Sequence, residues 1–163
     1  MKKLKNNKGF TLIELLAVIV ILAILVAVAI PAVTRYLNTA RKGTYASNAQ
    51  AAISVVRNEV ISDGITAQTT YDLEDINEML EKKLENSPYG GTYKDESYVA
   101  VTFDTNGEAT YHICLLDDKG NGFYDATTNA ITEVNVTDEN VVNNSDGACA
   151  VASFGTTQQQ PAA

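Results

Sequence analysis

Few of the side chains that usually carry enzyme chemistry occur in this 163-residue chain, which has two cysteines and a single histidine, His112. A zinc site needs four ligands, so a site built from cysteine and histidine alone is excluded. The same shortage leaves little material for a Ser/His/Asp or Cys/His catalytic centre. We therefore expect no enzyme activity, and we interpret His112 as a sheet residue rather than a metal ligand.

One loop carries oxygen-bearing side chains at a spacing that invites comparison with calcium sites. Asp117, Asn121 and Asp125 stand at the first, fifth and ninth positions of the segment, with a glycine at the sixth. A calcium loop of the EF-hand type would also have an acid or amide where Lys119 stands and an acid where Thr128 stands. The segment is therefore either a candidate calcium site or a plain turn rich in glycine and asparagine, and no other cofactor is expected.

The N-terminal part of the chain is strongly apolar and contains one acid. Four lysines and no acidic residue precede Gly9, and Glu14 is the single charged residue between positions 10 and 34. This stretch is long enough to span about 30 Å of hydrocarbon as a helix, and its apolar run exceeds the roughly 7–15 residues of a secretory signal peptide. A carboxylate in such a segment is costly and usually has a partner. A free amine at Phe10, from the same chain or a neighbouring subunit, would be a suitable cation.

The residues from Lys8 to Leu16, KGFTLIELL, resemble the class III signal of type IV prepilins. The resemblance implies that a prepilin peptidase cuts between Gly9 and Phe10 at the cytoplasmic membrane face and that the new Phe10 amine is N-methylated. Glu14, the fifth residue of the processed chain, would then meet this amine during subunit assembly. Pro31 matches a proline common in type IV pilins and is expected to bend the helix. One departure from the pattern is that no glycine lies between Phe10 and Pro31.

Hydrophobic periodicity predicts an α+β fold, which is also the pilin layout. A continuous helix is expected over residues 10–62, because its second half carries an apolar stripe at steps of three and four. A small antiparallel sheet is expected to pack on that half. The shorter elements expected are a helix over 72–86 and strands over 98–104, 109–116, 130–136 and 149–154. The expected segments are a leader (1–9), a membrane-spanning or filament-core half of the helix (10–34), its amphipathic half (35–64), a globular head (65–154) and a disordered tail (155–163).

The resemblance also bears on the two cysteines. Cys114 and Cys149 would lie on the exported side of the membrane, where disulfides persist. Many pilins close their C-terminal region with such a bond, and here it would tie the strand-poor stretch 117–147 to the sheet. Two free buried thiols are the alternative.

Charge and resemblance together define the expected function. With 12 basic and 20 acidic residues the net charge is -8, so direct nucleic-acid binding is not expected. The resemblance implies a structural subunit, most readily a major pilin, held in the cytoplasmic membrane with its N-terminus inside. It would be processed by the prepilin peptidase/N-methyltransferase, passed to an inner-membrane assembly platform and polymerised into an extracellular helical homo-oligomer. The alternatives are a pseudopilin of a type II secretion or DNA-uptake system, and a membrane-tethered binding module that never polymerises.

Overall fold

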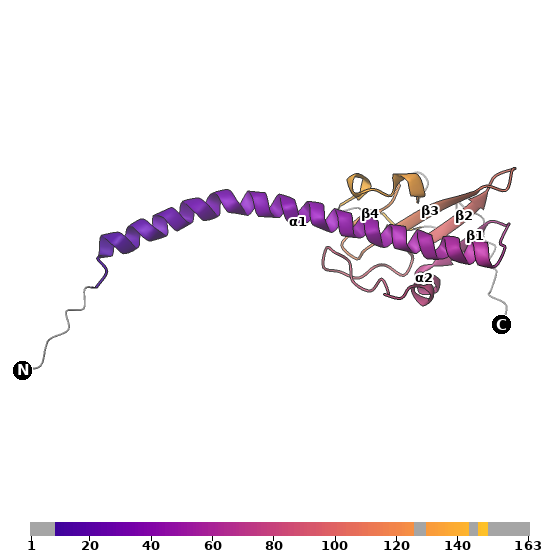
Figure 1. Cartoon of the computed structure of the whole chain (residues 1–163), viewed down its shortest axis with the longest axis horizontal. Coiled ribbons are helices and arrows are strands. Elements are labelled where there is room, and N and C mark those ends of the chain that lie inside the picture. The colour runs from indigo at the N-terminus through magenta and orange to yellow at the C-terminus, as the bar shows by residue number, and fades with distance from the viewer. Residues whose placement is uncertain (1–8, 126–129, 144–146, 150–163) are drawn as a thin grey trace, which may run out of the picture. The chain divides into compact units, whose positions relative to one another are not determined.

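The computed structural model describes residues 9–125, 130–143 and 147–149. The chain divides into two compact units, Met1–Asn38 and Thr39–Ala163, and helix α1, Leu12–Ser62, belongs to both (Figure 1). Each unit is described by itself. The expected tail at 155–163 and most of the expected strand at 149–154 lie outside the described residues.

The first unit consists, in its described part, of the apolar half of α1 and the short segment before it. Every residue from Leu12 to Asn38 is exposed. Pro31 lies inside the helix, where it has no backbone N–H to donate to the carbonyl of Ala27. The bend expected at Pro31 stays a prediction.

The second unit contains an antiparallel sheet of five strands in the order β1-β2-β3-β4, with β5 also pairing with β3. The strands are β1 Thr69–Asp72, β2 Tyr98–Phe103, β3 Ala109–Leu116, β4 Gly122–Phe123 and β5 Ile131–Thr132. The β2–β3 hairpin turns at Asn106 and Gly107, and Gly107 has a φ of 83°, which glycine adopts without strain. His112 lies on β3 as expected, with its Nε2 atom 3.1 Å from the Thr102 hydroxyl. The α+β prediction is confirmed.

Three of the shorter predicted elements differ from the structure in extent. Helix α2 covers Leu73–Met79 rather than 72–86, because Leu80 has an extended backbone and the backbone N–H of Leu84 donates to the Asn77 side chain instead of a helical carbonyl. Strand β1 lies where no strand was expected, and its last residue, Asp72, falls at the expected start of the short helix. Strand β5 is two residues long and gives way to a 3-10 helix at Glu133–Asn135.

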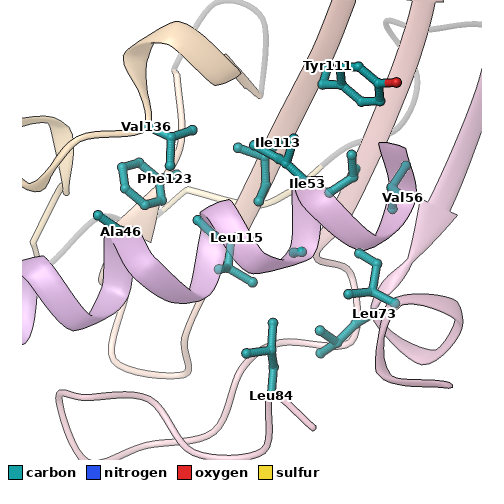
Figure 2. Close-up of a cluster of buried hydrophobic side chains, with 14 of the residues drawn as sticks. Ala46, Ile53, Val56, Leu73, Leu84, Tyr111, Ile113, Leu115, Phe123 and Val136 are labelled. Atoms are coloured by element: carbon teal, nitrogen blue, oxygen red, sulfur yellow. The ribbon is translucent and has the colours of Figure 1, made fainter. Parts of the chain in front are cut away.

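The head is organised around the sheet and the second half of α1. The stripe predicted on that helix is buried, and it packs against residues that alternate along β2 and β3, among them Val99, Val101, Ile113 and Leu115 (Figure 2). Three alanines in the stripe have small side chains that let the helix approach the sheet closely. On the other face of the sheet, Tyr98, Ala100, Cys114 and Leu116 form a smaller buried cluster with Ala130 and Cys149. Around these residues the sheet is therefore covered on both faces.

Candidate functional site

The predicted cleavage point lies just outside the long helix. Gly9, Phe10 and Thr11 precede the first helical residue, Leu12, and all are exposed. A Cβ atom added to Gly9 would meet no other atom within 4 Å. The packing of the chain therefore does not require glycine at this position.

Glu14 and Thr11 form a reciprocal helix cap. The backbone N–H and the hydroxyl of Thr11 each donate to Oε2 of Glu14 at 2.8 Å, and the backbone N–H of Glu14 lies 3.3 Å from the Thr11 hydroxyl oxygen. This capping box fixes the start of α1 at Leu12 rather than at Phe10. The sequence reasoning missed it, although Thr-x-x-Glu before an apolar run is the known signature.

The apolar half of α1 lacks a partner within the described chain. It is long and apolar enough to cross a membrane, and the span is not buried. Its exposed side chains include every leucine, isoleucine, valine and tyrosine from Leu12 to Leu37. A continuous apolar surface of this extent is stable only against lipid or against other apolar surfaces. This surface supports anchoring of the chain in a membrane.

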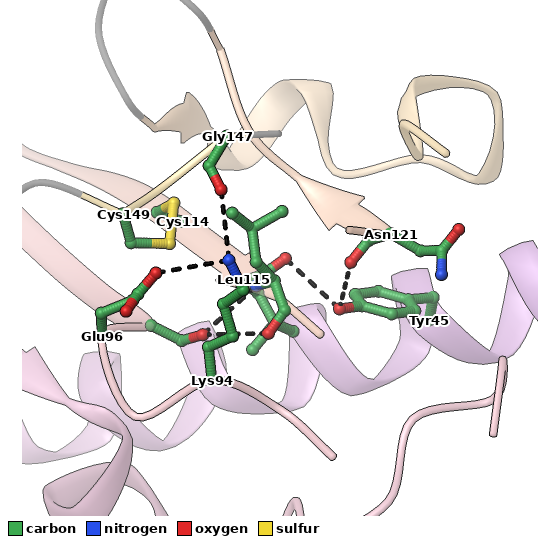
Figure 3. The surroundings of a disulfide bond; sticks show 10 residues. Tyr45, Lys94, Glu96, Cys114, Leu115, Asn121, Gly147 and Cys149 are labelled. Atoms are coloured by element: carbon green, nitrogen blue, oxygen red, sulfur yellow. Dashed lines mark hydrogen bonds and ion pairs between the residues drawn. A yellow bond between two sulfur atoms is a disulfide. The ribbon is translucent and has the colours of Figure 1, made fainter. Parts of the chain in front are cut away.

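The disulfide lies on the sheet face that α1 does not cover. Cys114 on β3 is joined to Cys149, and both residues are buried (Figure 3). The ammonium group of Lys94 lies near the disulfide. It donates a hydrogen bond to the carbonyl oxygen of Gly147 at 3.3 Å and forms an ion pair with Glu96 at 3.5 Å. The bond thus attaches the end of the described chain to the centre of the sheet.

Replacing both cysteines with alanine should lower the free energy of unfolding of the head by about 2–4 kcal/mol, because the unfolded chain regains the entropy of an open loop. Other contacts of the same region limit the loss: Arg57 pairs with Glu133, and the Gln50 amide donates to the Val136 carbonyl at 3.0 Å. Urea unfolding of the two proteins measures the difference. Equal stability would show that the bond adds nothing, and peptide mapping without reductant checks that it forms.

The loop considered for calcium is built around the buried carboxylate of Asp117. Its two oxygens accept hydrogen bonds from the Ser87 hydroxyl, from the backbone N–H groups of Lys119 and Asn121 at 3.0 and 2.7 Å, and from the Asn121 amide. A carboxylate that accepts several backbone and side-chain hydrogens is satisfied without a cation. Among the described residues no group of three or more acidic, histidine or cysteine side chains is placed to hold a metal.

Calcium binding by Asp117, Asn121 and Asp125 stays untested, and the hydrogen bonds favour the alternative, a structural turn. The amide of Asn121 directs its hydrogens, not its oxygen, at Asp117. We expect the melting temperature of the head to be the same in excess calcium and in excess chelator, because a ligand stabilises a fold only by binding it. A rise of several degrees with calcium would restore the metal site.

Tyr45 connects the long helix to this loop, and the sequence reasoning did not single out that role. Its side chain is fully buried, and its hydroxyl lies 2.9 Å from the carbonyl oxygen of Asn121, to which it donates, and 3.4 Å from that of Leu115 (Figure 3). The ring contacts Tyr93 and Phe123 edge-on, with centroids 5.3 and 6.0 Å apart. Burial raises the pKa of Tyr45 far above its ordinary value, so the hydroxyl remains a donor at all physiological pH values.

Changing Tyr45 to phenylalanine should destabilise the head by about 1–3 kcal/mol, since two buried carbonyl oxygens lose their shared donor. The ring contacts remain, so the fold should persist. Thermal or urea unfolding measures the loss, and Tyr36→Phe is the control because the Tyr36 side chain is exposed. A variant as stable as the wild type would show that the hydroxyl is not needed.

Comparison with known families agrees with the geometry of the N-terminus. Residues 4–30 match the family model of the prokaryotic N-terminal methylation motif. No significant match to the chain was found among curated proteins or solved structures. The matched residues include the cleavage point, Glu14 and most of the exposed apolar helix. The N-terminal segment therefore carries a prokaryotic N-terminal methylation motif, which supports a type IV pilin-like prepilin with a class III signal.

Proposed function

We propose that the processed chain is a structural pilus subunit, which polymerises through its apolar helix into a surface filament. The observation that carries the proposal is the exposed apolar half of α1, which starts at the methylation motif and leads into a folded head. Lipid covers this half in the membrane-anchored chain, and identical helices would cover it in the filament. The motif indicates a structural protein rather than an enzyme.

The same motif implies the partners that act first. A prepilin peptidase would remove residues 1–9 and methylate the Phe10 amine, and an inner-membrane assembly platform would then take up the subunit. The leader lysines favour a cytoplasmic N-terminus, which places the head outside. Removing the leader takes away four of the 12 basic residues and none of the 20 acidic ones, so the surface of the filament would be strongly negative.

Surface filaments sheared from native cells test the proposal. Electron microscopy should show fibres, and intact-mass analysis should find a subunit that begins with N-methylated Phe10 and contains the head. A subunit that retains residues 1–9 would contradict the processing step. A processed, methylated subunit found only in the cell envelope would favour the pseudopilin. A processed chain that is monomeric in every fraction would favour the tethered binding module.

A further inference from the structure

The Glu14 carboxylate is held by only one of its two oxygens. Both donors of Thr11, the backbone N–H and the hydroxyl, lie 2.8 Å from Oε2. Oε1 has no hydrogen-bond or ion-pair partner among the residues that the structure describes. Both donors of Thr11 are neutral, so they orient the carboxylate without cancelling its charge. One oxygen is therefore fixed and the other is available.

We propose that Thr11 is a positioning residue for subunit assembly, which holds Glu14 so that Oε1 faces the methylated amine of an incoming subunit. The proposal rests on the proposed function. A glutamate side chain loses rotamer freedom when it binds a cation. A side chain already held in its binding rotamer loses less, and the association is correspondingly tighter. Thr11 supplies this restraint from within the same subunit, before a neighbour arrives.

The hydroxyl of Thr11 can be removed while the shape of the side chain is kept. Thr11→Val deletes the hydroxyl's bond to Oε2 and the acceptor for the Glu14 N–H, but it keeps the backbone bond to Oε2. Thr11→Ser keeps a hydroxyl at the same place. Thr34→Val is a matched control, because the Thr34 hydroxyl also makes one bond in the same helix, 3.0 Å to the Ile30 carbonyl oxygen, with no carboxylate involved.

The experiment expresses the three variants and the wild type in native cells that lack their own copy, and it compares filaments recovered by shearing with mature subunit in the membrane. Thr11→Val should lower the ratio of filament to mature subunit about tenfold, the factor that corresponds to one hydrogen bond to a charged group. Thr11→Ser and Thr34→Val should match the wild type.

Several outcomes would overturn the role of Thr11. Normal filament yield from Thr11→Val would show that the hydroxyl does not position Glu14. Loss of filaments with accumulation of uncleaved precursor would place Thr11 in processing instead, and failure of Thr11→Ser to restore the yield would exclude the hydroxyl as the cause. Absence of filaments from all four chains, wild type included, would overturn the proposed function and this role with it.

Discussion

Cells that produce the Gly9→Val chain should accumulate uncleaved precursor in the membrane and form no surface filaments. We expect the cause of this block to lie outside the chain, because a Cβ at Gly9 meets no atom within 4 Å and the residue precedes the helix. The variant should therefore insert and fold normally. A glycine allows close backbone approach, and a peptidase that cuts after Gly9 would have to bring its catalytic groups to the carbonyl carbon of this residue.

Immunoblots that separate precursor from mature subunit measure the effect. Gly43→Val is the matched control: Gly43 lies in α1, and an added Cβ there also meets nothing within 4 Å. This control should be processed like the wild type. Full cleavage of the Gly9→Val chain would contradict the assignment of the cut, whereas failure of both variants would indicate a general effect on insertion.

Helices, strands and turns whose sequence signal lies in neighbouring residues could be predicted from the sequence. The apolar stripe placed the second half of α1 correctly to Ser62, and the asparagine–glycine pair at 106–107 marked the hairpin between β2 and β3. Within β2 and β3 the alternation correctly separated inward residues such as Val101 and Ile113 from their neighbours. In each case the signal lies within about ten residues of its effect.

Features that depend on distant partners could not be predicted in this way. The hydroxyl of Tyr45 bonds to carbonyl groups 70 and 76 positions later, and its own neighbourhood shows only another apolar stripe residue. Strands β4 and β5 are two residues long and exist because β3 offers them an edge. Tertiary contacts overrode the local pattern at each of these places.

The candidate site falls between these two cases. Gly9, Phe10 and Glu14 could be proposed from the sequence because a processing signal is read from consecutive residues. Their roles stay predictions. The contact between Thr11 and Glu14 is equally local and could have been predicted from the Thr-x-x-Glu spacing. In the precursor this carboxylate caps a helix, and cleavage would then supply its cation.

Replacing Glu14 with alanine or with glutamine should nearly abolish filament assembly while membrane insertion and leader cleavage survive or improve. Both variants remove a charge from an apolar helix, which eases insertion. In the proposed filament, an incoming subunit whose amine meets Glu14 would sit in register, whereas one out of register would leave two charges unpaired in apolar surroundings. Without the carboxylate the amine is unpaired in every register. The ratio of sheared filament to mature subunit measures the loss, which should be at least about tenfold.

The two substitutions separate the charge from the cap. The glutamine side chain keeps an oxygen that can accept hydrogen bonds from Thr11. The Glu14→Gln variant therefore retains much of the capping box and loses only the charge. If the charge sets the register, both variants fail alike, and Glu59→Ala, which removes another carboxylate of α1, assembles normally. If the glutamine variant assembles and the alanine variant does not, the filament requires the capping box between Thr11 and residue 14 rather than the charge. Normal filaments from both variants would show that Glu14 has no role between subunits and that the apolar surface of α1 assembles unaided.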